Sequence, residues 1–341
     1  MPNVVPHIGP GVQGHLNLMT DSNLLPTEFV GDIFSKAKQQ SILMQYGQQI
    51  PVSLGETSVY VGGDKPAAGQ VGGTTLASRE GAEKPVAGLR YGTRQSFMPI
   101  KLAVIITASR EYALVNPDQM WTKLATDLPA AIARAADLAV VHGRDALRGT
   151  ALNGIAVNGF INETTNRVEL DTSAGASPDM VDQLIAGWKL VVGDDDKDYD
   201  FTNWAYAPEI VPDIVTLRRS DGTPVFYPAS VPSTGSEINL NAGVGSLLGI
   251  PAAAHRVVHG KVDNAPKTNV RILGGDFSQL AYGFADQITF RITDQASLSN
   301  GAGGVINLWQ TNQVAVLCEA TFGWLVNDPD AFVAFELPAA P

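Results

Sequence analysis

A long helical pattern between Asn116 and Asp145 constrains the fold more than any other stretch of this chain. Apolar residues recur there at spacings of three and four, which places them on one helix face: Leu124, Leu128, Ile132, Ala135, Leu138 and Val141. Low-complexity and glycine-rich stretches precede this pattern, and strand-like stretches dominate after it. The pattern predicts a helix that serves as the backbone of a flat, extended protein.

Several residues indicate where this helix begins and ends. Thr126 or Asp127 can cap a helix, and Pro129 would then lie in its first turn, where the missing N–H costs little. Gly143 favours an end at about His142. We therefore predict a short leading helix, a break near Asp127, and a main helix that ends at His142.

Strand patterns dominate the rest of the sequence. We predict seven strands, at Gln48–Val52, Ser58–Val61, Tyr91–Thr107, Phe201–Tyr206, Gln287–Thr293, Gln313–Ala320 and Ala331–Glu336. Pro99, within the third, indicates an edge strand or a bulge. Three further helices are predicted, at Pro26–Tyr46, from Ser177 with Ser177 as its cap, and from Pro208 to about Arg219. Helices and strands do not alternate as in a doubly wound sheet, so the sequence favours an α+β fold.

Composition and charge exclude several classes of protein. Charged residues make up only 17% of the 341 residues, so much of the surface should contact other chains. The net charge is −11 and no basic patch is visible, which argues against a protein that grips nucleic acid tightly. The single cysteine, Cys318, excludes an internal disulfide and is interpreted as a buried strand thiol. We find no membrane-spanning apolar run and no signal peptide.

Residues 55–94 form an unusual glycine-rich stretch. It holds nine of the chain's 34 glycines, and its thin apolar content cannot offset the entropy cost of ordering it. The stretch should therefore be either floppy or packed on a partner. Its charges are concentrated towards the returning strand, and we predict inter-subunit ion pairs for Arg79, Glu80, Glu83, Lys84, Arg90 and Arg94. The alternative is a solvated loop with no fixed partners.

The sequence offers no constellation of residues for catalysis or metal binding. Phosphate-binding and nucleophile motifs are absent, and no acid–base pair can be assigned. His255 and His259 are four residues apart but have no third ligand nearby. Five aspartates lie between Asp194 and Asp200, but Tyr199 stands where a calcium-binding EF-hand loop needs glycine. We therefore predict a solvated acidic loop, and a protein that is not an enzyme and uses no cofactor or metal.

Seven stretches carry a likeness to a known family: REGAEKP (79–85), FMPIKLAVIITASREY (97–112), DLPAAIARAADLAVVHG (127–143), NWAYAP…LRRSDGTPVF (203–226), GIPAAAHRVV (249–258), GGDFSQLAYGFADQITFRITD (274–294) and DPDAFVAFEL (328–337). In this order, and over nearly the whole chain, they resemble the major capsid protein family of tailed bacteriophages, which has the Hong Kong 97 fold. The resemblance implies a subunit that self-assembles into pentamers and hexamers. These would form an icosahedral head shell around double-stranded phage DNA.

The resemblance also implies a division of the chain. The implied parts are an N-arm with a short helix (1–49), an E-loop laid over the adjacent subunit (50–108), a P-domain with the long helix as its spine and a β-sheet (109–175 and 266–341), and an A-domain around the five- and six-fold axes (176–265). Asp194, Asp195 and Asp196 would then either face their own copies at the axis or point away from it. If they face one another, assembly should be favoured by raised ionic strength.

Other partners follow from the same resemblance. A portal and a possible decoration protein are implied. Because the chain starts almost at the arm, a separate scaffolding protein, or none, is expected. The shell would enclose DNA without sequence-specific binding, would not contact a membrane, and would be assembled in the host bacterial cytoplasm as part of the virion. One alternative is an encapsulin-like bacterial shell that encloses cargo protein. Another is an enzyme, for which the sequence names no pocket residues.

Overall fold

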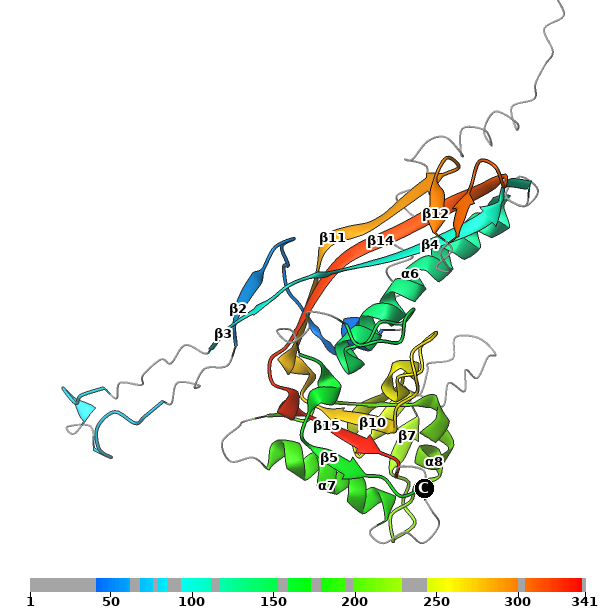
Figure 1. Ribbon diagram of the computed structural model, residues 1–341. Coiled ribbons are helices and arrows are strands. Elements are labelled where there is room, and N and C mark those ends of the chain that lie inside the picture. The colour runs from blue at the N-terminus through cyan, green and yellow to red at the C-terminus, as the bar shows by residue number, and fades with distance from the viewer. Residues whose placement is uncertain are drawn as a thin grey trace, which may run out of the picture.

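The computed structural model describes residues 41–61, 68–75, 79–84, 93–111, 117–152, 159–172, 179–193, 199–228, 244–299 and 304–338. A four-stranded sheet with the long helix occupies the upper part of Figure 1, and a seven-stranded sheet occupies the lower part. The predicted N-terminal arm and most of the helix predicted from Pro26 lie outside the described residues. The same holds for Arg90 and for Asp194, Asp195 and Asp196.

The four-stranded sheet is built around two long antiparallel strands. Its order is β1 (Gln48–Gln49), β11 (Leu280–Thr293), β14 (Gln313–Val326) and β4 (Ile100–Ser109). Strand β1 is parallel to β11, and the other neighbours are antiparallel. The strand predicted at Gln48–Val52 is shorter than expected, because only Gln48 and Gln49 pair with β11. The strand predicted at Tyr91–Thr107 is interrupted at Met98 and Pro99, and its second part is an edge strand, as the proline indicated.

Helix α6 (Pro117–His142) covers one face of this sheet. Its Leu128 and Ile132 form an apolar cluster with buried residues of β14, namely Val316, Cys318 and Ala320. The predicted break near Asp127 is wrong, because the helix runs without interruption through Pro129. Proline removes one hydrogen bond, and burial of the helix face against the sheet outweighs that loss. The helix ends at His142 as predicted, with Gly143 at a φ of 62°.

The seven-stranded sheet has its own apolar core. Its order is β5 (Arg167–Glu169), β15 (Phe332–Glu336), β10 (Val270–Gly275), β6 (Asn203–Tyr206), β9 (Ile250–Ala254), β8 (Val244–Leu247) and β7 (Phe226–Pro228). Trp204, Tyr206 and Phe335 are fully buried there. Gly187, in the packed helix α7 (Met180–Val192), leaves room for the Phe335 ring, because an added Cβ would overlap it.

Two predicted helices begin or end elsewhere than expected. The cap of α7 is Asp179, whose side chain accepts a hydrogen bond from the Asp182 N–H, so the predicted cap at Ser177 is wrong. The helix predicted from Pro208 is a 3-10 turn, η3 (Pro208–Ile210), followed by α8 (Val211–Thr216). Helix α8 stops at Thr216, because Leu217 leaves the helical conformation with a ψ of 131°. The chain then turns back on itself, and Arg218 pairs with Pro224. The other 3-10 helices among the described residues are η2 (Ile161–Glu163), η4 (Arg256–His259), η5 (Phe277–Gln279) and η6 (Pro329–Ala331).

A buried carboxylate ties the short helix α3 (Ile42–Tyr46) to α6. The Ser41 hydroxyl donates to Oδ1 of Asp137 at 2.6 Å, and the N–H groups of Ile42 and Leu43 donate to the same carboxylate at 3.2 Å. The Ser41 hydroxyl also accepts from the Met44 N–H. Asp137 thus satisfies N–H groups that would be free at the start of α3. Burial raises the pKa of Asp137 to about 7, although these hydrogen bonds oppose the rise.

Candidate assembly surfaces

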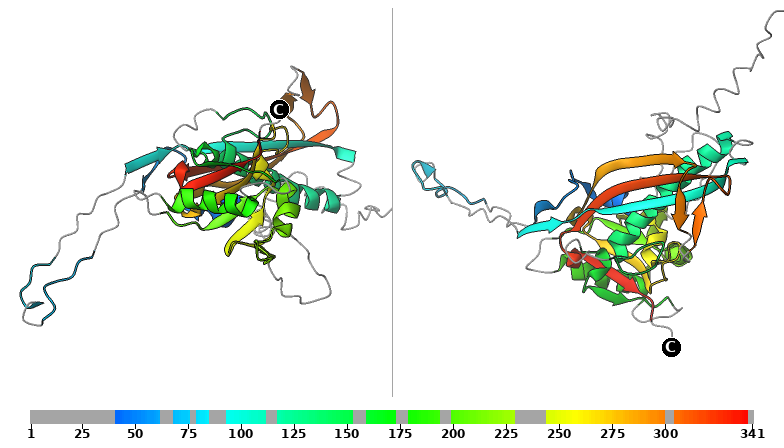
Figure 2. Two further views of the ribbon diagram at one scale, coloured as in Figure 1. Left: turned by 90° about the horizontal axis from the view of Figure 1, so that it is seen from below. Right: turned by 45° about the horizontal axis from the view of Figure 1, so that its top comes forward.

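A two-stranded ribbon of β2 (Thr57–Val61) and β3 (Thr93–Phe97) extends away from the rest of the molecule (Figure 2). Its base rests on two glycines that face each other, Gly283 in β11 and Gly323 in β14. A Cβ at Gly323 would lie 2.7 Å from Cε2 of the buried Phe97 ring, and one at Gly283 would overlap the Ile50 carbonyl. Because the two glycines have no side chains, the chain can pass close to the sheet at Ile50, before the ribbon, and at Phe97, at its end.

Four of the predicted contact residues lie at the far end of this ribbon: Arg79, Glu80, Glu83 and Lys84. All four are exposed, and none forms an ion pair with another described residue. The Arg79 side chain donates from Nε to the carbonyl of Gly73 at 3.1 Å. Arg94 lies in β3, at a position whose side chain is not described. The ribbon therefore presents charges of both signs at a distance from its own sheets.

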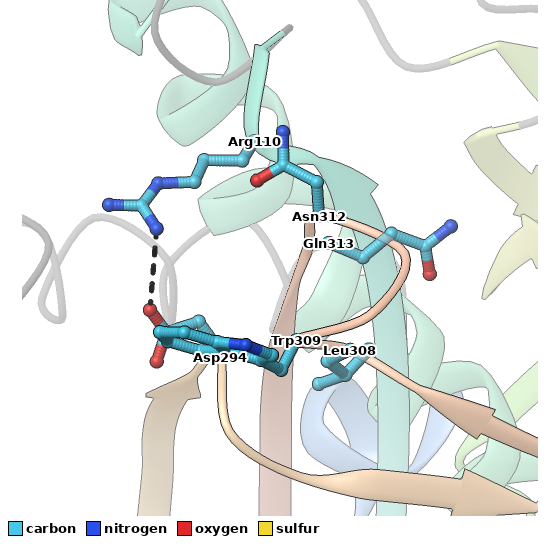
Figure 3. Close-up of a pocket in the computed structure, with 6 residues that line it drawn as sticks. All are labelled: Arg110, Asp294, Leu308, Trp309, Asn312 and Gln313. Atoms are coloured by element: carbon cyan, nitrogen blue, oxygen red, sulfur yellow. Dashed lines mark ion pairs between the residues drawn. The ribbon is translucent and has the colours of Figure 1, made fainter.

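The opposite end of the four-stranded sheet carries a second candidate surface. A short ribbon of β12 (Ser297–Ser299) and β13 (Val305–Asn307) connects β11 to β14. Beside it lies a hollow of about 130 Å³, in which Arg110 and Asp294 form an ion pair at 3.7 Å (Figure 3). Trp309, in the wall of this hollow, is 71% exposed, and Val305 is 72% exposed. Large exposed apolar side chains at a projecting tip indicate a contact surface.

The face of the sheet turned away from α6 is a third candidate. Strand β4 alternates along its whole length, and Ile105 on the open face is 50% exposed. Glu319 at the centre of this face accepts from Lys101 at 2.8 Å and lies 3.9 Å from Arg291. The hydrogen bond from Lys101 holds the pKa of Glu319 below its usual value. The face thus combines apolar area with a compact group of charges.

His142, at the end of α6, and His259, one of the two histidines considered for metal binding, both make structural contacts. His142 lies with Nε2 3.0 Å and 3.1 Å from the carbonyl oxygens of Val257 and Val258, and burial lowers its pKa to about 4. The ring of His259 accepts from the Lys261 N–H at 3.0 Å. Within the described residues, no three His, Cys, Asp or Glu side chains come together as a metal site.

Cys318 is fully buried in β14, as predicted. Burial raises the pKa of its thiol to about 12. In the part of the chain covered by the structure, no helix is both long and apolar enough to cross a membrane.

Comparison with known proteins identifies the family of this chain. A family model described as the phage capsid family matches residues 21–337. The chain belongs to the phage capsid family. A "Probable major capsid protein gp17" of Mycobacterium phage D29 is 30% identical over 315 residues, which cover 91% of this chain and 89% of that protein. The corresponding protein of Mycobacterium phage L5 is 29% identical, over 91% of this chain and 88% of the other.

Solved structures from other phages resemble this capsid protein in fold. A chain from Gordonia phage Cozz superposes with a TM-score of 0.65 at 29% identity, covering 88% of this capsid protein and 87% of the other chain. A chain from Mycobacterium phage Ogopogo gives 0.62 at 24% identity, covering 87% and 92%, and shows the likeness of fold. The protein is therefore a major capsid protein, a structural component of a phage particle. Family membership favours this function over the encapsulin-like alternative.

Proposed function

We propose that this capsid protein has the Hong Kong 97 fold and assembles into pentamers and hexamers of an icosahedral shell around double-stranded DNA. The observation that carries the proposal is the β2–β3 ribbon, which extends away from the two larger sheets and carries four exposed charges between its strands, within residues 79–84. A chain can offset the entropy cost of ordering such a ribbon by laying it on a neighbour.

The parts of the structure support a division of labour in that shell. Residues 50–108, with the ribbon, act as the E-loop, and residues 1–49 act as the N-arm. The P-domain, 109–175 and 266–341, contains the long helix α6 and the two long strands β11 and β14 of the four-stranded sheet. Residues 176–265 form the A-domain around the symmetry axes, and Asp194, Asp195 and Asp196 then either face their own copies at the axis or point away from it. Arg90 and Arg94 join the other ribbon charges in contacts between subunits.

Further partners belong to the same proposal. A scaffolding protein, a portal and a decoration protein would act with the shell, which would be assembled in the host bacterial cytoplasm. The mixture of exposed apolar and charged residues at the tip with Trp309 suits contacts between neighbouring capsomers. Each such contact contributes little binding free energy, and its repetition around closed rings stabilises the shell.

Site-specific cross-linking tests whether the ribbon lies on a neighbour. A photoreactive thiol label is attached at Glu83→Cys, since the buried Cys318 will not compete for it. Irradiated particles should give a ladder of covalent oligomers that ends at five and six subunits. A label at Ser53→Cys, exposed near the base of the ribbon, is the matched control and should give a weaker ladder. Adducts confined to single chains at Glu83→Cys would refute the proposal.

A further inference from the structure

The fold brings together two loop segments that are far apart in the sequence. Residues 144–149 follow the end of α6, and residues 256–271 run from η4 to the start of β10. The Asn264 N–H donates to the carbonyl of Ala146 at 3.1 Å, and its side-chain amide donates to the carbonyl of Leu147 at 2.9 Å. Arg144 reaches the carbonyl of Pro266 at 3.4 Å. The two segments therefore form one continuous surface.

This surface is basic, in contrast to the chain as a whole. We call it the basic patch, and its six cations are Arg144, Arg148, Arg256, Lys261, Lys267 and Arg271. Only Asp145 and Asp263 within the two segments are acidic, which gives these segments a net charge of +4, or +3 with the contacting Glu209, in a chain of net charge −11. The cations are spread over both segments without adjacent pairs, so the sequence did not reveal the patch.

Few of these cations are neutralised nearby. Lys267 pairs with Glu209 at 2.7 Å, and the buried Arg271 lies 3.7 Å from the same carboxylate. The hydrogen bond from Lys267 holds the pKa of Glu209 low, so this carboxylate stays charged. The side chain of Asp145 is used by two backbone N–H groups of its own turn.

Three cations of the patch remain available to a ligand. Arg148, Arg256 and Lys261 are exposed, and none of them forms an ion pair with another described residue. Arg144 is half-buried and donates to a carbonyl. A surface with exposed, uncompensated cations next to a buried arginine attracts polyanions.

We propose that the basic patch binds the phosphate groups of the double-stranded DNA that the shell encloses. The proposal rests on the function proposed above. Five of the six cations lie on loops and on a 3-10 turn, and the sixth, Arg271, is buried in β10. The exposed cations therefore provide charge without a helix or ribbon to enter a DNA groove. Binding should therefore be independent of sequence and strongly dependent on salt.

An acidic surface on a second copy of the chain is the competing ligand. Leu147 lies within the patch and is 72% exposed, which a protein partner could use. A single apolar side chain among exposed cations is a weak basis for a protein interface, since the cores of such interfaces are depleted in charge. The charges favour DNA.

Binding of a 30-base-pair duplex to unassembled full-length subunits, followed by fluorescence anisotropy between 50 and 200 mM salt, tests the proposal. The patch variant carries Arg148→Gln, Arg256→Gln and Lys261→Gln. Each lost phosphate contact reduces the slope of log K against log salt by about 0.9. Over this fourfold range of salt, the affinity of the natural chain should therefore fall by about 40-fold more than that of the variant.

Two matched variants make the result specific. Lys189→Gln, Arg218→Gln and Arg219→Gln remove three exposed cations elsewhere and should leave the salt slope unchanged. Arg148→Lys, Arg256→Lys and Lys261→Arg keep the charge and should bind DNA like the natural chain. Equal slopes for the natural chain and the patch variant, or no DNA binding at 50 mM salt, would overturn the proposal.

Electron microscopy of the same variants separates this proposal from the function proposed above. The patch variant should still form particles. If it fails to do so while the matched variant assembles, the patch is a contact between copies and the DNA proposal is wrong. If even the natural chain forms no particles, the proposed shell fails, whereas the anisotropy measurement still decides whether the patch binds DNA.

Discussion

Replacing Asp137 by asparagine should change the pH dependence of subunit stability in a defined direction. Burial raises the pKa of Asp137 from 3.8 to about 7 in the folded chain. The folded state therefore holds the proton more tightly than the unfolded state, so the group's contribution is fully present below pH 3.8. It is lost as the pH rises through 7. A difference of about three pH units corresponds to about 4 kcal/mol in the free energy of unfolding.

His142 acts in the opposite direction over an overlapping range. Burial lowers its pKa from 6.5 to about 4, so its contribution is present above pH 6.5 and is lost as the pH falls through 4. That contribution is about 3 kcal/mol. The profile of the natural chain sums both effects, and only the difference between the natural chain and Asp137→Asn isolates the carboxyl group.

Urea unfolding of the unassembled chain between pH 4 and pH 8 measures this difference. Asp137→Asn should be less stable than the natural chain at pH 4 by about 1–2 kcal/mol, because its amide cannot accept from the Ile42 N–H. It should gain about 4 kcal/mol relative to the natural chain by pH 8. Asp213→Asn, at an exposed position in α8, is the matched control. Parallel profiles for the natural chain and Asp137→Asn would show that burial does not raise the pKa of Asp137.

Three further outcomes are expected. Glu83→Ala with Lys84→Ala should impair assembly and leave the circular dichroism of the subunit unchanged, and normal assembly would count against the ribbon as a contact. Gly323→Val should lower the unfolding temperature, because its Cβ would lie 2.7 Å from the Phe97 ring and overpacking costs about 1–3 kcal/mol; an unchanged temperature would contradict this packing. Burial raises the Cys318 pKa to about 12, so a thiol reagent should label it only after unfolding, and rapid labelling of the folded chain would show otherwise.

Local patterns predicted the regular elements well where packing followed them. Helix α6 ends at His142 because Gly143 adopts a positive φ, and β4 alternates because every second side chain faces the apolar surface beneath α6. The predicted break near Asp127 was wrong, because a capping residue and a proline start a helix only where tertiary packing does not hold the preceding residues in the helix as well. Here the face with Leu128 and Ile132 is held against the sheet, which outweighs that local signal.

The lengths of the two long strands could not be predicted for a different reason. Strand β11 starts at Leu280, seven residues before the predicted Gln287, and β14 continues to Val326. Their pairing shifts register between Phe284 and Thr289, which interrupts the alternation that a sequence pattern relies on. Gly283 and Gly323 do not contribute to a hydrophobic pattern, so the sequence did not indicate that they make room for the chain that crosses the sheet.

The polar contacts that matter most join distant parts of the sequence. Ser41 and Asp137 are 96 residues apart, and no local pattern links a buried carboxylate to the start of another helix. The two segments of the basic patch are separated by more than 100 residues. The ribbon charges were visible in the sequence, but Arg79, Glu80, Glu83 and Lys84 form no ion pair with another described residue, so their predicted pairing with other subunits stays a prediction.

Electron microscopy of the purified natural chain tests the proposed shell. Closed shells, or rings of five and six subunits, are expected, in which the β2–β3 ribbon of one subunit lies on the next. A chain that stays monomeric at every concentration up to its solubility limit would contradict it.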